Sequence, residues 1–245
     1  TLNGVHTELA LYAVDLASGD QSVTSPHLIP EGYHGDIYAL GSAPDGTFLV
    51  VYSHDVATGG GLSELYYALG KLGSPRVMDL GELFPQLYLP TRVTWDGEAF
   101  QVHGENGATV AVARVSTSGE VLLPKTDFGV SWNPGYGPLG YRLEYEPVTE
   151  LTWIWDGDGA GSGLVQAHDK LGTPLFPYPG VVVEGVEQKT TPGSAMSARP
   201  DGVSLAWHEW AIGSTLPFAE RVSLEGERQG PFGFAQELWY DTFAL

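Results

Sequence analysis

The sequence contains no cysteine. This excludes disulfide bonds, thiolate metal ligands and a cysteine nucleophile. It also contains no apolar run of 18 residues or more and no long segment with apolar residues at helical spacing. We therefore expect neither membrane insertion nor a helical protein.

Basic residues are scarce: 11 lysines and arginines stand against 30 aspartates and glutamates, for a net charge of -19. Such a chain repels duplex nucleic acid and anionic membrane surfaces, so we expect no nucleic-acid partner. Cations and neutral ligands such as sugars remain open. The simplest alternative is that the acidic surplus keeps an exported protein soluble.

Glycine and proline are abundant, with 33 and 17 residues. This composition is unsuited to helices but typical of many short strands joined by tight turns. The sequence therefore predicts an all-β protein.

A repeat of about 50 residues runs through the chain. Its first signal is an apolar strand followed by a turn glycine, which can supply a positive φ. The turn glycines are Gly19, Gly73, Gly119, Gly172 and Gly226. Its second signal is an Asp-Gly turn between two short strands, at Asp45, Asp96 and Asp201, replaced in another repeat by residues 146–150.

Each repeat reads as four strands, best seen at residues 91–95, 99–103, 109–115 and 120–123. Four-stranded antiparallel units at this spacing are typical of β-propeller blades. We predict one domain over residues 1–245, a five-bladed β-propeller closed by pairing of its N- and C-terminal strands. In this prediction residues 236–245 lie beside the hairpin at residues 12–20.

The segments Pro90–Gly97 (PTRVTWDG) and Ala113–Pro124 (ARVSTSGEVLLP) resemble bacterial secreted β-propeller-like repeat proteins. The resemblance implies an exported repeat scaffold, extracellular, periplasmic or on the cell surface, without a defined activity. The first residue, Thr1, agrees with a processed, exported chain.

Polar residues gather where the second strand of each repeat ends. The candidates for ligand binding there are His54, His103, Glu105, His208 and Glu209. A ring of carboxylates and imidazoles at a channel mouth could bind a ligand, but solvated residues at strand ends look the same in a sequence. None of the seven histidines has a zinc-ligand spacing.

Two loops offer further candidates. Asp156 and Asp158 alternate in a glycine-rich stretch and could bind Ca²⁺, although Ala160 and Ala167 occupy positions where an EF-hand has ligands. A plain hairpin loop is the alternative, and we expect no obligatory cofactor. Trp132 and Tyr136 lie in a Gly/Pro-rich connection and could stack on a sugar ring.

The sequence favours a non-enzymatic binding or scaffold module that recognises a glycan or a protein surface through one propeller face. Two alternatives remain open. One is a glycoside hydrolase with paired carboxylates at the channel mouth. The other is a structural subunit of a larger extracellular assembly.

Overall fold

A computed structural model gives the structure of the chain. It describes residues 12–14, 21–23, 37–54, 64–71, 77–81, 89–105, 110–127, 142–157, 161–186, 195–211 and 214–233. Every regular element in these ranges is a β-strand, as the composition predicted. A helix long and apolar enough to cross a membrane does not occur among these residues.

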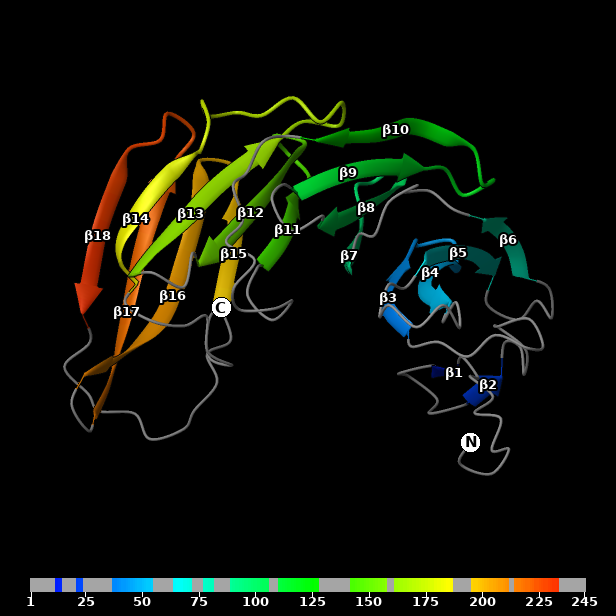
Figure 1. Ribbon diagram of the computed structural model, residues 1–245, viewed down its shortest axis with the longest axis horizontal. Helices are drawn as coiled ribbons and strands as arrows, with labels where there is room; N and C mark the ends of the chain where they lie inside the picture. The colour runs from blue at the N-terminus through cyan, green and yellow to red at the C-terminus, as the bar shows by residue number, and fades with distance from the viewer. Residues whose placement is uncertain are drawn as a thin grey trace. The chain divides into compact units, whose positions relative to one another are not determined.

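Four sheets of four strands each make up most of the described structure (Figure 1). In every sheet the strands follow one another in sequence order. The first sheet consists of β3 (Ile37–Ser42), β4 (Thr47–His54), β5 (Glu64–Lys71) and β6 (Val77–Gly81). The second consists of β7 (Leu89–Trp95), β8 (Phe100–Glu105), β9 (Val110–Val115) and β10 (Val121–Asp127). The third consists of β11 (Arg142–Glu146), β12 (Leu151–Gly157), β13 (Gly161–His168) and β14 (Val181–Val186). The fourth consists of β15 (Ala195–Arg199), β16 (Gly202–Ala211), β17 (Ser214–Ser223) and β18 (Arg228–Gly233).

These sheets confirm the four-stranded repeat, and the strands predicted for the second repeat match β7 to β10 within a few residues. The N-terminal copy is also a hairpin, because β1 (Tyr12–Val14) pairs antiparallel with β2 (Gln21–Val23). Residues 236–245 lie outside the described residues. The number of blades and the closure of a ring therefore stay predictions.

The chain divides into two compact units. One contains Thr1–Val102 and Ala113–Lys125, and the other contains His103–Val112 and Thr126–Leu245. In the first unit β3 contacts β7, and in the second β11 contacts β15. The first strands of neighbouring sheets thus meet within each unit, which is the contact that blades of a propeller make.

The turn glycines Gly119, Gly172 and Gly226 have the positive φ that the sequence predicted, while Gly19 and Gly73 lie outside the described residues. The glycines of the Asp-Gly turns share this backbone. Gly46, Gly97 and Gly202 have φ of 83°, 90° and 138°. In the third sheet the corresponding turn ends on Glu150, a non-glycine residue with φ of 56°. The Glu146 carboxylate supports that turn by accepting the Thr149 N–H at 2.6 Å.

An acidic residue of this turn pairs with a basic residue of the third strand, or just after it, in all four sheets. The pairs are Asp45 with Lys71 at 3.6 Å, Asp96 with Arg114 at 2.7 Å, Glu150 with Lys170 at 2.9 Å, and Asp201 with Arg221. Of these, the Asp96–Arg114 pair is buried. All four sheets therefore share an ion pair that joins the turn between their first and second strands to their third strand or to the residues just after it.

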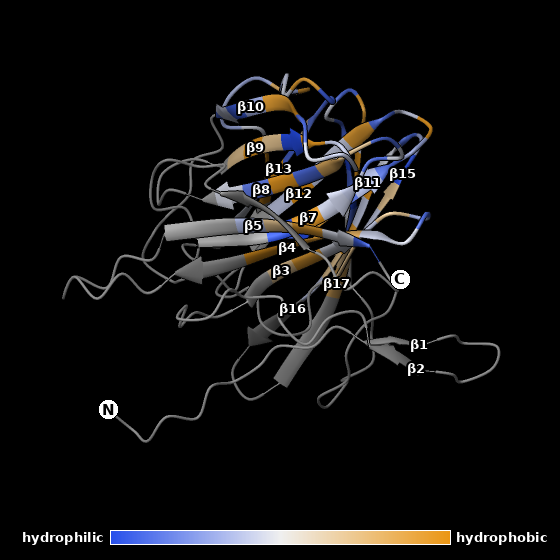
Figure 2. Ribbon diagram, turned by 90° about the vertical axis from the view of Figure 1, so that its right-hand side faces the viewer, coloured by the Kyte–Doolittle hydropathy of each residue, from blue (hydrophilic) through white to orange (hydrophobic). Residues whose placement is uncertain are grey.

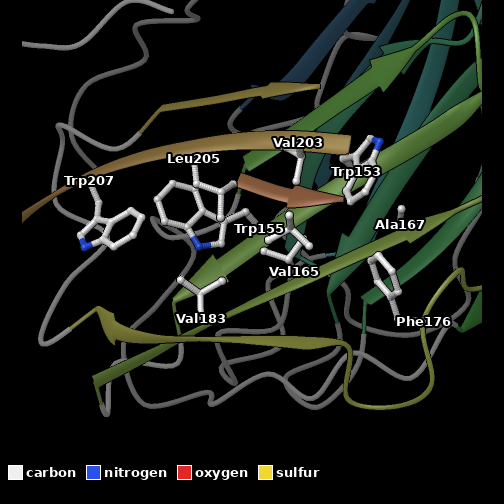
Figure 3. Packing of buried hydrophobic residues seen from close by; sticks show 10 residues of the cluster. Trp153, Trp155, Val165, Ala167, Phe176, Val183, Val203, Leu205 and Trp207 are labelled. Carbon is white, nitrogen blue, oxygen red and sulfur yellow. The ribbon is translucent and has the colours of Figure 1, made fainter. Parts of the chain in front are cut away.

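The core of the second unit is built mainly from the second and third strands of its third and fourth sheets, with Val183 of β14 and Phe176 of the preceding connection added to them. Trp155 of β12 and Trp207 of β16 pack against each other, with ring centroids 5.9 Å apart at 61° (Figure 3). By strand register Trp155 corresponds to Ala206 and not to Trp207, because Thr152 and Val203 are the equivalent residues opposite His168 and Val222. Both indoles are buried, which confirms that these two tryptophans pack between repeats, although they do not recur at one position of the repeat. Figure 2 shows the hydrophobic stretches running along the strands, for example β9.

Candidate functional site

The candidate ligand-binding residues were predicted to lie where the second strands end, and the structure confirms this place for some of them and not for others. His54 and Glu105 are the last residues of β4 and β8, as predicted. His208 and Glu209 lie inside the ten-residue strand β16, opposite Pro217 and Leu216, and not at its end. The side chains of these four residues are outside the described part of the structure, so their ligand-binding role stays a prediction.

His103 is buried and faces His168, a residue that the sequence did not single out. The two Nε2 atoms lie 3.0 Å apart, and the ring centroids are 5.3 Å apart. His103 belongs to β8 and His168 to β13, so the contact joins strands of two repeats. The only sequence signal for this pair is that His168 ends the third strand of its repeat.

The hydrogen bonds of His168 assign the protons of the pair. The Nδ1 atom of His168 lies 2.7 Å from the carbonyl oxygen of Asp169, so Nδ1 carries the proton and donates it. When both imidazoles are neutral, the Nε2 atom of His168 is the acceptor and His103 donates its Nε2–H to it.

Burial lowers the pKa of His103 well below its usual value of 6.5, and the neighbouring His168 lowers it further. A charged imidazole loses its hydration inside the protein, and a second imidazole nearby penalises the charge again. The pair therefore holds the two repeats together in its neutral form. Ligand binding by His103 would require the residues that bury its side chain to move apart.

Among the described residues, Asp96 is the most buried carboxylate at a turn, and its hydrogen bonds there are all internal to its repeat. It accepts the Arg114 Nε–H at 2.7 Å, the Ala99 N–H at 2.8 Å and the Gln101 side-chain amide at 3.1 Å. Burial opposes ionisation, but Arg114 and the N–H groups outweigh it and lower the pKa of Asp96. This carboxylate fixes the turn and is not offered to a ligand.

The pKa of Glu144 on β11 is shifted in the opposite direction to that of Asp96. Burial raises its pKa, and the N–H that Ala198 donates to it at 3.0 Å offsets this only in part. Its strand is half-exposed along residues 142–145, and so is the neighbouring strand β15 along residues 195–198. Glu144 is thus a carboxyl of raised pKa on the first strand of a repeat, and no sequence motif marks it.

The predicted Ca²⁺ loop is mostly strand. β12 extends through Asp156 to Gly157, β13 begins at Gly161, and Gly157 pairs with Gly163. The Asp156 side chain, Asp158 and the loop with Trp132 and Tyr136 lie outside the described structure. Groups of three or more potential metal ligands are absent from the residues that are described.

The connection between β13 and β14, residues 169–180, is held in place by a buried glutamine. The Gln166 side chain accepts the Phe176 N–H and donates to the Phe176 carbonyl oxygen, both at 3.0 Å. The Phe176 ring is buried 6.0 Å from the Trp153 ring (Figure 3). These contacts fix an irregular segment at its centre.

The same connection exposes large apolar side chains on either side of that anchor. Leu171 is 68% exposed, Tyr178 is 65% exposed, and Leu175 is also exposed. Lys170 bonds Glu150 at 2.9 Å and ties this connection to the turn that carries the exposed Val148. The sequence signal was available in Gly172–Gly180, where three apolar or aromatic residues lie among three prolines.

The sequence matches no protein-family model, and no curated protein is significantly similar to it. Several solved β-propeller structures are similar in fold. An α-L-arabinofuranosidase from Podospora anserina in complex with cellotriose is 15% identical over 86% of this chain and 72% of that protein, with a TM-score of 0.39. An α-L-arabinofuranosidase from Clostridium thermocellum is 12% identical over 79% of this chain and 70% of that protein, with a TM-score of 0.42.

A chain of the nidogen/laminin complex is 10% identical over 93% of this chain and 89% of its own length, with a TM-score of 0.44. At this level of identity the likeness concerns the fold and no activity. The chain is therefore an all-β protein of four-stranded antiparallel repeats that is similar in fold to β-propeller proteins.

Proposed function

We propose that the chain is a non-enzymatic, extracellular binding or scaffold module that recognises a protein or glycan surface through one face of a β-propeller. The observation that supports this is the connection at residues 169–180. It presents Leu171, Leu175 and Tyr178 to solvent while Phe176 and Gln166 anchor its centre. Exposed aromatic and aliphatic side chains on an ordered segment are typical of binding sites.

Anchoring matters because a binding surface that is already ordered loses less conformational entropy when the ligand arrives. Tyrosine is well suited to this role, since its ring packs on peptides or sugars and its hydroxyl forms hydrogen bonds. The described turn carboxylate Asp96 and the His103–His168 pair instead form internal bonds. Their roles are structural, which agrees with a scaffold that carries its function on a connection.

The test is binding of the purified chain to a printed glycan array and to a displayed library of random peptides. The double variant Leu171→Ala, Tyr178→Ala should lose at least about tenfold in affinity for the selected ligand, the effect of about 1.4 kcal/mol. Leu122→Ala is the matched control, because Leu122 is an exposed leucine on another outer strand, β10. Equal affinities of the double variant and the control would refute the proposed surface.

Glycoside hydrolysis is the second candidate, and Glu144 is the observation that favours it. A carboxyl of raised pKa suits a general acid, provided that a second carboxylate lies within about 10 Å. Turnover of a panel of p-nitrophenyl glycosides by the chain, abolished in Glu144→Gln, would support hydrolysis. If the chain turns over none of these substrates but still binds its ligand, hydrolysis is refuted and the binding function stands.

A further inference from the structure

The outer edge of β14 has the features of a docking strand. β14 is the last strand of the third sheet, and β13 pairs with its inner edge through Leu164↔Val182 and Val165↔Val181. No strand within the described ranges pairs with its outer edge. Backbone N–H and C=O groups on such an edge can form a ladder with an added strand.

Two of the other outer strands carry residues that discourage an added basic strand. β10 contains Pro124 and Lys125, and β18 contains Pro231, whereas the charged residues of β6 and β14 are acidic, Asp79 and Glu184. Proline removes a ladder donor, and a lysine repels a cationic segment. β14 instead begins with three consecutive valines, and Val182 is 39% exposed.

The surroundings of β14 are acidic. Gly226, in the turn between β17 and β18, lies so close to Val181 that an added Cβ would be 3.2 Å from its Cγ2 atom. The exposed residues Glu225 and Glu227 flank this glycine. No basic side chain of the described structure forms an ion pair with either glutamate, and the nearby Arg228 is bound by the buried Glu220.

We propose that β14 accepts an extended, positively charged peptide segment as a fifth strand of the third sheet. An apolar residue of the segment would pack on Val182, and a lysine or arginine would lie beside Glu225 and Glu227. The net charge of -19 opposes a second copy of this chain at the same edge and attracts a cationic segment. This inference rests on the proposed binding function and names its partner as a basic, extended peptide.

The probe is a short capped peptide in which valine alternates with lysine, labelled with a fluorophore. A second peptide carries glutamate in place of lysine. Fluorescence anisotropy of the full chain at low salt should show binding of the lysine peptide and none of the glutamate peptide. Because long-range attraction is screened by salt, the affinity should fall as the salt concentration rises.

The edge itself is tested with Val182→Lys, which gives β14 a charge like that of Lys125 on β10. The substitution adds a solvated side chain at an exposed position, so the fold tolerates it. Affinity for the lysine peptide should fall at least about tenfold. Leu122→Lys is the matched control on β10, and it should leave the affinity unchanged.

The charge requirement is tested with Glu225→Gln, Glu227→Gln. This double variant should weaken binding about fivefold at low salt and flatten the salt dependence. Glu120→Gln is the control, because Glu120 follows Gly119 in the turn of the second sheet as Glu227 follows Gly226. Glu120 is also exposed, so its loss changes the net charge without touching β14.

The outcomes separate this inference from the proposed function. Binding of any array or library ligand that depends on Tyr178 but not on Val182 would overturn the docking edge and keep the binding module. Equal binding of the lysine and glutamate peptides would also overturn it. A concentration-dependent dimer that Val182→Lys dissociates, measured by sedimentation velocity, would replace the peptide with a second copy of the chain.

Discussion

Acid should destabilise the folded chain well above the pH at which its carboxylates protonate, because His103 is buried in a neutral pair with His168. In the folded state the pKa of His103 lies well below 6.5, whereas the unfolded chain has the ordinary value. Between these values the unfolded state binds the proton and the folded state does not. The stabilisation is therefore complete above pH 6.5 and is lost as the pH falls toward the folded pKa.

The magnitude follows from proton linkage. For a group of unfolded pKa 6.5 that stays neutral in the folded chain, the loss of stability on going from about pH 7.5 to about pH 5.5 is about 1.4 kcal/mol. Asp45, Asp96 and Asp201 have pKa values lowered from 3.8, so the stability that they provide is lost only at a more acidic pH. Glu144, whose pKa is raised from 4.5, contributes alike to the parent and to a variant at position 103, so the difference between these two chains isolates the imidazole.

Urea unfolding followed by tryptophan fluorescence at both ends of the interval measures this loss. His103→Gln removes the titrating group, so its own loss across the interval should be smaller than that of the parent by about 1.4 kcal/mol. His6→Gln serves as the comparison for removing a histidine elsewhere in the chain. Because His103→Gln also leaves His168 without its donor, its stability at the upper pH should already be lower.

An NMR titration of the parent chain provides an independent check that needs no variant. The Cε1 proton of His103 should not titrate across the same interval. A midpoint near the ordinary value of 6.5 for this imidazole, or equal pH dependence of the parent and His103→Gln, would refute the buried neutral pair.

Three further changes test the turns and the anchored connection. Gly202→Ala should destabilise the chain by several kcal/mol in urea unfolding, because its Cβ would clash with the Val222 carbonyl oxygen. Gly97→Ala should cost only about 1 kcal/mol, because nothing lies within 4 Å of its Cβ. Glu150→Gly should raise the free energy of unfolding by about 0.5 to 1 kcal/mol, since glycine adopts a φ of 56° without strain and the lost ion pair with Lys170 is largely exposed. Gln166→Ala should lower the free energy of unfolding by about 2 to 3 kcal/mol and increase proteolytic cleavage within residues 169–180, because both hydrogen bonds to Phe176 are lost. Unchanged cleavage would contradict the anchoring role of Gln166.

Turns and strands were predictable because their signals are local. A positive φ at a hairpin turn selects glycine, so Gly97, Gly119, Gly172 and Gly226 mark the hairpins in the sequence itself. The β-branched and aromatic residues between these turns then placed the strands. The packing of Trp155 on Trp207 was also predicted, but their register was not: they lie one residue apart in the repeat, which turns them to the facing sides of neighbouring sheets.

The candidate site was harder to predict because its contacts are distant in sequence. His103 and His168 are 65 residues apart, and nothing in either repeat shows that their rings meet. His103 sits near a strand end, where solvated and buried imidazoles follow the same pattern. Whether such an imidazole is solvated or buried depends on how one repeat packs on the next, and in this chain that packing buries His103.

The connection at residues 169–180 shows why a function can be carried by a departure from a repeat. The other described turns after a third strand are short, for example residues 116–120 and 224–227, and lead directly into the fourth strand. The third repeat forms the same turn at residues 169–173, with Leu171 exposed in it, and then adds residues 174–180 before its fourth strand. Gln166 and Phe176 anchor this added segment, which exposes Leu175 and Tyr178. Residues required by the fold recur from repeat to repeat, so a well-anchored segment that does not recur needs another explanation. Exposed apolar side chains oppose solubility unless they meet a partner, and this makes the third repeat the place where a partner should bind.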